Sequence, residues 1–268
     1  MQYIENHQMV FLEEGRNTIA YYSNNPNPKN LLIFVHGFGG KSVGTWGDFP
    51  IYIKNFAEYN SCDVIFYGYK SMKTPAIGSS ELFYQHLKKF VNPRITIGNT
   101  SRGDAIEEYK NIVFIGHSLG AIIIRRTLLD AKKDNPSWLS NCKIILFAPA
   151  HRGAHIHRLI IEAIPDLFRA IGSAAKILFN SLNDLEAGSD TITDLINDNN
   201  KYLSDKKNDS FTKAAYIMAA VNDKVVLKNR FCDDPNVEPI EEKGHISICK
   251  PILGKYENPI NPLKRNIL

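Results

Sequence analysis

The sequence contains few cysteines and no long apolar run. Its 268 residues include four cysteines, and no two of these have the C-x-x-C spacing that is typical of structural zinc sites. Isolated cysteines beside apolar runs are most often small buried side chains. No segment reaches the roughly 18 apolar residues that a membrane-spanning helix needs. The four cysteines are Cys62, Cys142, Cys232 and Cys249.

Neither positive nor negative residues are in large excess. The chain has 32 Lys and Arg against 28 Asp and Glu, a net charge of +4, and its basic residues are scattered. Nucleic-acid binding usually needs a concentrated basic stripe, so no nucleic-acid partner is expected. A secretory signal has a basic region followed by an apolar stretch, and the segment Met1–His7 has neither. We therefore expect a cytoplasmic protein, although a trimmed targeting segment would leave the same sequence.

Short apolar runs, in contrast, recur along the whole chain, with helical or irregular segments between them. Helices are predicted at Ser80–Phe90 and Ala121–Leu129, the second with Arg125 and Arg126 turned outward. This alternation predicts one α/β domain over residues 1–268, with a mostly parallel sheet that helices cover on both faces. The predicted strands are Met9–Leu12, Thr18–Tyr22, Leu31–Val35, Val64–Tyr67, Ile112–Ile115, Lys143–Phe147 and Ala214–Val221.

Residues 151–204 interrupt the alternation. They include two helix-like runs, Arg158–Ala163 and Leu167–Phe179. Compact domains rarely carry loops of more than about 15 residues without a role, so we predict a cap or lid-like insertion above the carboxyl edge of the sheet. A crossover helix with long loops is the alternative. Within it, Ile156–Phe179 mixes apolar and basic residues, as helices at a membrane surface often do, so peripheral membrane contact is a further hypothesis.

The segment Gly116–Gly120 joins a predicted strand directly to a predicted helix. Its sequence, Gly-His-Ser-Leu-Gly, has the G-x-S-x-G pattern of a nucleophile elbow. Such a tight turn forces Ser118 into a strained backbone conformation and leaves room only for glycine two residues before and after it. The hydroxyl is then held at the positive N-terminal end of a helix. The pattern alone arises by chance in about one chain in ten of this length, so other residues must support it.

A serine nucleophile needs a base, an acid that orients the base, and donors for the developing oxyanion. His245 is the candidate base, and Asp223, directly after a predicted strand, is the candidate acid. The chain order Ser118, Asp223, His245 is that of the α/β-hydrolases. Other candidates for the acid are Asp190, Asp233 and Asp234.

A glycine-rich segment, His36–Gly40, follows the predicted strand Leu31–Val35. Such a loop lets backbone N–H groups approach a substrate carbonyl, and the N–H groups of Phe38 and Leu119 are the predicted oxyanion donors. His36 is expected to tie the loop down by hydrogen bonds. The residues expected to line the substrate site are Gly37, Gly39 and His117.

Three further histidines, His151, His155 and His157, form a local cluster. No carboxylate or cysteine stands beside them, and a catalytic zinc normally needs three convergent ligands. We therefore expect them to line or flank the substrate pocket, and we expect neither a metal nor any other cofactor.

The sequence resembles the α/β-hydrolases of the lipase–esterase kind. Val35–Gly40 is similar to the oxyanion loop of that family, Gly116–Gly120 to its elbow, and Asp223 and His245 to its acid and base. The resemblance spans Leu31–Pro251. Within the superfamily, the glycine loop up to Trp46 and the segment Gly244–Pro251 most resemble the serine-active-site-containing hydrolases linked to phospholipid remodelling.

This resemblance implies the α/β-hydrolase fold and a serine hydrolase that cleaves a carboxylic ester through an acyl-enzyme. The substrate would be a small-molecule or lipid ester, while thioesters and amides stay open because the same residues can serve all of them. Two alternatives remain: a catalytically silent binding module with the same fold, and a phospholipid hydrolase or acyltransferase at a membrane surface. The sequence does not indicate an oligomeric state.

Overall fold

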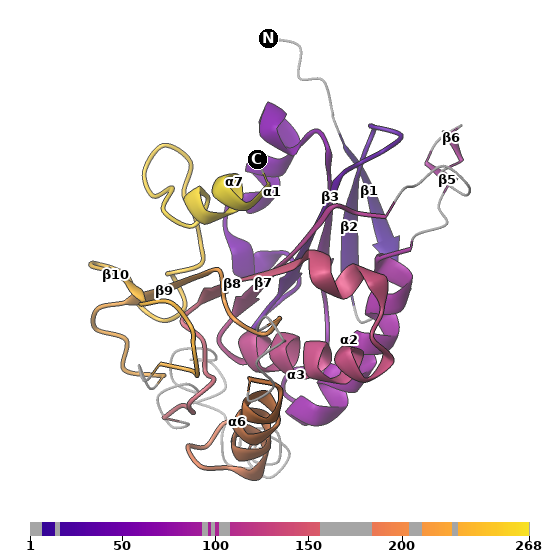
Figure 1. The fold of residues 1–268 in the computed structure, drawn as a ribbon. Coiled ribbons are helices and arrows are strands. Elements are labelled where there is room, and N and C mark those ends of the chain that lie inside the picture. The colour runs from indigo at the N-terminus through magenta and orange to yellow at the C-terminus, as the bar shows by residue number, and fades with distance from the viewer. Residues whose placement is uncertain are drawn as a thin grey trace.

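The fold is built on a central sheet (Figure 1). The structure, a computed structural model, describes residues 7–13, 17–92, 96–97, 100–101, 108–155, 184–203, 211–226 and 230–267. Within these ranges the sheet has eight strands in the order β1-β2-β4-β3-β7-β8-β9-β10. The strands are β1 (His7–Leu12), β2 (Thr18–Ser23), β3 (Asn30–Val35), β4 (Cys62–Tyr67), β7 (Asn111–His117), β8 (Cys142–Phe147), β9 (Tyr216–Ala220) and β10 (Glu238–Ile240).

Parallel pairing dominates this sheet, as predicted. Each neighbouring pair from β4 to β10 is parallel. The exception is the N-terminal hairpin, in which β1 pairs antiparallel with β2, and β2 pairs antiparallel with β4. A separate two-stranded hairpin is formed by β5 (Thr96–Ile97) and β6 (Thr100–Ser101).

Helices cover both faces of the sheet, which explains why the central strands are continuous apolar runs. On one face, the ring of Phe34 in β3 packs 5.0 Å from that of Phe49 in α1. On the other face, the ring of Phe114 in β7 lies 6.2 Å from that of Phe83 in α2. Figure 1 shows α7 on the same side as α1, and α3 and α6 on the same side as α2. The helices are α1 (Phe49–Asn55), α2 (Ala76–Phe90), α3 (Leu119–Asp134), α6 (Asp190–Leu203) and α7 (Asn261–Ile267), with short 3-10 turns η1 (Gly44–Trp46), η2 (Ala57–Tyr59) and η3 (Ser137–Asn141).

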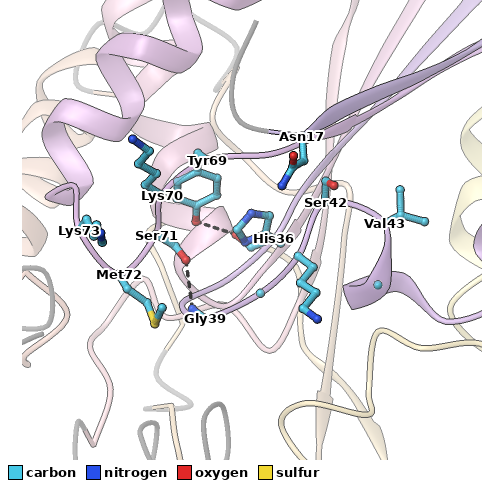
Figure 2. Close-up of a pocket in the computed structure, with 13 residues that line it drawn as sticks. Asn17, His36, Gly39, Ser42, Val43, Tyr69, Lys70, Ser71, Met72 and Lys73 are labelled. Carbon is cyan, nitrogen blue, oxygen red and sulfur yellow. Dashed lines mark hydrogen bonds between the residues drawn. The ribbon is translucent and has the colours of Figure 1, made fainter. Parts of the chain in front are cut away.

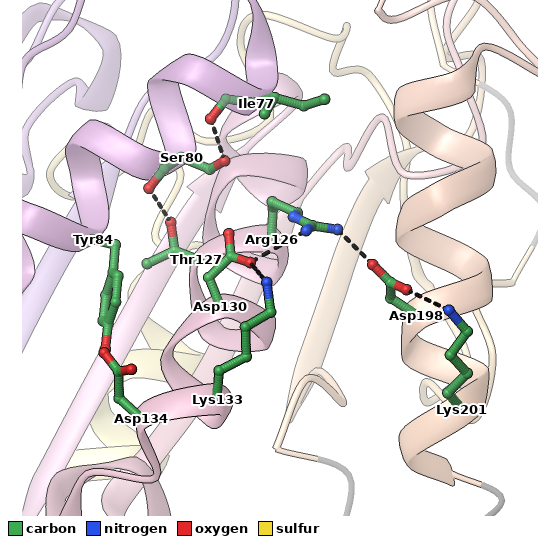
Figure 3. A network of polar contacts seen from close by, with 10 residues as sticks. All are labelled: Ile77, Ser80, Tyr84, Arg126, Thr127, Asp130, Lys133, Asp134, Asp198 and Lys201. Carbon is green, nitrogen blue, oxygen red and sulfur yellow. Dashed lines mark hydrogen bonds and ion pairs between the residues drawn. The ribbon is translucent and has the colours of Figure 1, made fainter.

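A polar network fastens α3 to the helices on either side of it (Figure 3). The hydroxyl of Thr127 in α3 donates to the carbonyl of Ser80 in α2 at 3.0 Å. On the other side, the guanidinium of Arg126 forms a 2.7 Å ion pair with Asp198 of α6. These contacts fix the helix that begins directly after Ser118 against both of its neighbours.

The prediction that Arg125 points outward is wrong. Its side chain is completely buried and forms a 2.5 Å ion pair with Asp234, which is equally buried. The guanidinium also lies 4.0 Å from the centre of the Phe231 ring. Arg126, its neighbour, is partly exposed as expected. The difference arises because α3 is packed against the sheet, α2 and the loop that contains Asp234, so little of its circumference faces solvent.

The predicted insertion at 151–204 is described only in part. Residues 156–183, which contain both helix-like runs, lie outside the described residues, so the cap or lid stays a prediction. The final part of the segment forms α6, which packs against α3. None of the described helices is both long enough and apolar enough to cross a membrane.

Candidate active site

The turn at Ser118 has the strained geometry that its sequence predicts. Ser118 stands between β7 and α3 with φ of 52° and ψ of −117°, in a region that residues other than glycine rarely adopt. A Cβ atom on Gly120 would lie 2.1 Å from the carbonyl oxygen of Val35, and one on Gly116 would lie 2.8 Å from the Ile124 side chain. Only glycine fits at position 120, where the turn presses the chain against the backbone of β3, while a larger residue at position 116 would displace the side chains of Ile124 and Leu146.

Three polar side chains meet at this turn. The Nε2 atom of His245 lies 3.0 Å from Ser118 Oγ, and its Nδ1 atom lies 3.0 Å from Asp223 Oδ2. Because a carboxylate only accepts hydrogen bonds, Nδ1 carries the ring proton and Nε2 is left as the acceptor for the serine hydroxyl. Ser118 and His245 are each 1% exposed. The structure thus brings together the predicted nucleophile, base and acid.

Asp223 is held by backbone groups as well as by the histidine. It follows β9, and its Oδ1 atom accepts hydrogen bonds from the N–H groups of Val225 at 2.8 Å and Val226 at 3.3 Å. Burial alone would raise the pKa of Asp223, but the contact with His245 and these two N–H groups lower it below the ordinary value. The carboxylate is therefore charged and directed at the ring.

The other candidate acids lie elsewhere. Asp234 pairs with Arg125, and Asp233 lies 3.7 Å from the ammonium group of Lys213. Asp190 is the first residue of α6. Asp223 is thus the candidate that contacts His245.

His117 is hydrogen-bonded to the backbone of His245, the predicted base, a contact that the sequence did not reveal. Its Nε2 atom donates to the backbone carbonyl of His245 at 2.9 Å. Burial and the neighbouring His245 lower the pKa of His117 to about 3. The ring is neutral at physiological pH and links the elbow to the loop that carries the base. No sequence signal marks this contact, because His117 occupies the variable second position of the G-x-S-x-G pattern.

The glycine loop lies directly against Ser118, the predicted nucleophile. A Cβ atom on Gly37 would be 2.9 Å from Ser118 Cβ. The Nδ1 atom of His36 donates to the Gly37 carbonyl at 2.8 Å, so the prediction that His36 ties the loop down is confirmed. Burial lowers the pKa of His36 to about 4, although this hydrogen bond by itself would raise the pKa.

Two residues after β4 also support the loop, and sequence reasoning missed both (Figure 2). The ring of Tyr69 stacks on that of His36, 4.3 Å away, and its hydroxyl donates to the His36 carbonyl at 2.7 Å. The Ser71 hydroxyl accepts a 3.0 Å hydrogen bond from the N–H of Gly39. Gly39, which the sequence predicts to line the substrate site, borders a cavity beside Phe38 and His117, while its N–H is bound to this serine.

The predicted oxyanion donors belong to the glycine loop and to the elbow. Phe38 follows Gly37, and Leu119 follows Ser118 at the start of α3. In the part of the chain that the structure describes, neither N–H donates to another protein group. Both residues are almost completely buried. Two N–H groups beside the serine are thus free to bind an oxygen atom.

A cavity of about 310 Å³ opens beside these groups. Phe38, His117 and Ile246 contribute to its wall, so it borders the glycine loop, the elbow and the loop that carries the base. Lys41 and Lys250 add positive charge to it. Its position is suitable for one part of a substrate bound at Ser118.

The histidine cluster contributes little to this geometry. The His151 ring packs 5.1 Å from that of Phe231, and the His155 N–H donates to the Val225 carbonyl at 2.7 Å. His157 lies outside the described residues. Among the described side chains, no three His, Cys, Asp or Glu residues are arranged to hold a metal ion.

Because His36 and His117 are buried and neutral, we expect the folded protein to lose stability in acid. In the unfolded chain, His36 and His117 take up protons near pH 6.5, whereas in the folded protein they stay neutral down to about pH 4 and about pH 3. The free energy of unfolding should therefore fall between pH 6.5 and pH 4.5, by up to about 1.4 kcal/mol per pH unit for each histidine. Urea unfolding at several pH values measures this slope.

The His117→Gln variant is the matched control for this prediction. Glutamine can still donate to the His245 carbonyl but does not titrate. The variant should lose stability less steeply with falling pH than the wild type, whatever its stability at pH 7. Equal slopes would contradict the assignment of a neutral His117.

Comparison with known proteins finds one family that matches part of the chain. Residues 25–149 match the family described as "Putative serine esterase (DUF676)". The matched region contains the glycine loop and the elbow, while Asp223 and His245 lie beyond it. No curated protein sequence matches the chain.

Solved structures resemble the whole chain. Lipase BlEst2 of Bacillus licheniformis, in its mature form, has a TM-score of 0.54 at 15% identity over 88% of this chain and 92% of its own. The α/β hydrolase MGS-MChE2, from the metagenome of sediments from the lagoon of Mar Chica, Morocco, has a TM-score of 0.51 at 15% identity over 96% of both chains. The 2-hydroxy-6-oxo-6-phenylhexa-2,4-dienoate hydrolase of Rhodococcus sp. strain RHA1 has a TM-score of 0.51 at 12% identity over 98% of both chains. These likenesses show the α/β-hydrolase fold.

Proposed function

We propose that this chain, which has the α/β-hydrolase fold, is a serine hydrolase that cleaves carboxylic esters through an acyl-enzyme. One observation carries the proposal: the hydrogen-bonded series from Ser118 through His245 to Asp223, with both distances at 3.0 Å. A buried serine, a histidine in the tautomer that accepts its proton, and a charged carboxylate together have the arrangement that acyl transfer requires.

In the first half of the reaction, Ser118 Oγ attacks the ester carbonyl and His245 Nε2 takes its proton. The N–H groups of Phe38 and Leu119 bind the oxyanion that develops. Asp223 keeps the ring oriented and stabilises its positive charge. His245 then protonates the leaving alcohol, which gives the acyl-enzyme. In the second half, His245 activates a water molecule that releases the acid and restores Ser118.

A lipid or small-molecule ester is the substrate class that the relatives favour. The matching family is described as a serine esterase, and BlEst2 is named a lipase. The cap predicted over residues 151–204 would supply apolar contacts for an acyl chain and, as a further hypothesis, contact with a membrane surface. All four cysteines are free thiols, which suits a reducing compartment such as the cytoplasm.

Covalent labelling tests the proposed nucleophile. A fluorophosphonate probe should label the wild-type protein on Ser118, because His245 activates this hydroxyl and the loop amides bind the phosphonyl oxygen. The Ser118→Ala variant should not react, while Ser140→Ala, which changes an exposed serine, should react like the wild type. If the folded wild-type protein fails to label, the chain is better explained as a binding module.

A further inference from the structure

A second cavity, of about 520 Å³, lies along the glycine loop (Figure 2). One wall is formed by the loop residues Gly39–Gly44, and the opposite wall by Tyr69–Lys73, which follow β4; Asn17 and His36 complete it. We call this cavity the lysine pocket, because Lys41, Lys70 and Lys73 all line it. Among the described residues that line it, none is an Asp or Glu.

The three ammonium groups pair with no Asp or Glu in the described part of the chain. All three side chains are exposed, and within the described ranges no carboxylate forms an ion pair with any of them. The buried hydroxyl groups of Ser42 and Ser71 add polar groups to the same walls. Charges of one sign around a cavity concentrate the field inside it and attract an ion of the opposite sign. The lysine pocket is thus suited to an anionic group.

The pocket is joined to the proposed catalytic centre through shared residues. Gly39, Gly40, Lys41 and Gly44 line both the lysine pocket and the 310 Å³ cavity beside Phe38 and His117. The shared wall is held firmly, because the N–H of Gly39 is bound to Ser71 and its neighbour His36 is stacked on Tyr69. The 310 Å³ cavity reaches Phe38 and His117, the neighbour of Ser118, so a substrate that occupies this cavity would have its far end next to the lysine pocket.

From these contacts we propose that the lysine pocket binds an anionic group, a phosphate or carboxylate, carried by the ester that Ser118 attacks. This inference rests on the proposed function, since it assigns a charged substrate to the same site. Lysine suits this role because its ammonium group is a mobile point charge that adapts to different anions. Neutral esters would occupy the catalytic centre without this additional contact.

Matched ester pairs test the proposal. The first pair differs in the alcohol: 1-hexanoylglycerol and 1-hexanoylglycerol 3-phosphate. The second differs in the acyl group: 4-nitrophenyl hexanoate and mono-4-nitrophenyl adipate. In at least one pair, the Lys70→Met/Lys73→Met variant should lower kcat/KM for the anionic ester about tenfold relative to its neutral partner, because two partly solvated ion pairs are lost. The pair that responds identifies the part of the substrate that carries the charge.

A second double variant controls for net charge. Lys110→Met/Lys255→Met removes two exposed lysines that do not line the pocket. Its ratio of anionic to neutral kcat/KM should stay within about twofold of the wild type. Equal changes of the ratio in both double variants would overturn the proposal, because they would show a general charge effect.

A binding measurement separates this proposal from the catalytic one. Calorimetry on the Ser118→Ala protein needs no turnover. If the alcohol part of the substrate carries the charge, the protein should bind 1-hexanoylglycerol 3-phosphate about tenfold more tightly than 1-hexanoylglycerol. If the acyl part carries the charge, the protein should bind mono-4-nitrophenyl adipate about tenfold more tightly than 4-nitrophenyl hexanoate. Lys70→Met/Lys73→Met in this background should remove the preference. Equal affinities within both pairs, or equally tight binding of inorganic phosphate alone, would overturn the proposal. A Ser118→Ala protein that still hydrolyses esters would refute the catalytic proposal alone.

Discussion

Replacing Ser118 by alanine is expected to lower kcat for ester hydrolysis by about 10⁶-fold, close to the loss seen when the nucleophile of a serine hydrolase is removed. Alanine leaves no oxygen to attack the carbonyl, so the acyl-enzyme cannot form. Any remaining rate would come from water held near the Phe38 and Leu119 N–H groups. Burst-phase and steady-state assays with a 4-nitrophenyl ester measure this difference.

The fold should survive this replacement, which makes the variant a clean test. Alanine is smaller than serine and removes one hydrogen bond, to His245. Its urea midpoint should stay close to that of the wild type. Comparable hydrolysis by the two folded proteins would contradict the role of Ser118.

The Arg125→Met variant is expected to lose about 3–5 kcal/mol of unfolding free energy. Both members of the Arg125–Asp234 pair are completely buried, so methionine would leave the Asp234 carboxylate in the interior without a counter-charge. It would also remove the guanidinium from the face of the Phe231 ring. Urea denaturation of the purified protein measures the loss.

Arg126→Met is the matched control, because it makes the same change at the next residue of α3. Arg126 is partly exposed and pairs with Asp130 and Asp198 near the surface. Such pairs contribute about 1 kcal/mol or less, so this variant should lose much less stability. In addition, Arg125→Met/Asp234→Asn should be more stable than the sum of the two single losses predicts, because the second change removes the stranded charge. Equal losses in the two single methionine variants would contradict the special role of the buried pair.

The sequence predicts the elbow well because the geometry of that turn is encoded locally. Three positions within five residues specify the sharp angle. The strands before the glycine loop and the elbow are marked by the apolar runs Leu31–Val35 and Ile112–Ile115, because helices cover both faces of the sheet. The order of residues along the chain then singles out Asp223, which follows a predicted strand, and His245, which follows Gly244. A local sequence pattern is enough to predict a feature whose residue types are set by the local backbone conformation.

Contacts between distant segments are not encoded in this way. The sequence around Arg125 gives two adjacent arginines on an apolar helix, and a charged residue on such a helix usually faces solvent. Its actual partner, Asp234, is 109 residues away. Tyr69 and Ser71 support the glycine loop from beyond β4, and no periodicity indicates that they would do so. These contacts depend on how the strands are ordered in space, which the sequence does not show directly.

The distance along the chain between Ser118 and His245 also bears on how the protein is made. The two residues are 127 positions apart, although their side chains touch. A ribosome therefore synthesises the serine well before the histidine that is proposed to activate it. The central strands β3, β4 and β7 are complete while His245 has yet to be added. A nascent chain stopped at that stage carries an inert hydroxyl, so hydrolytic activity would begin only late in synthesis.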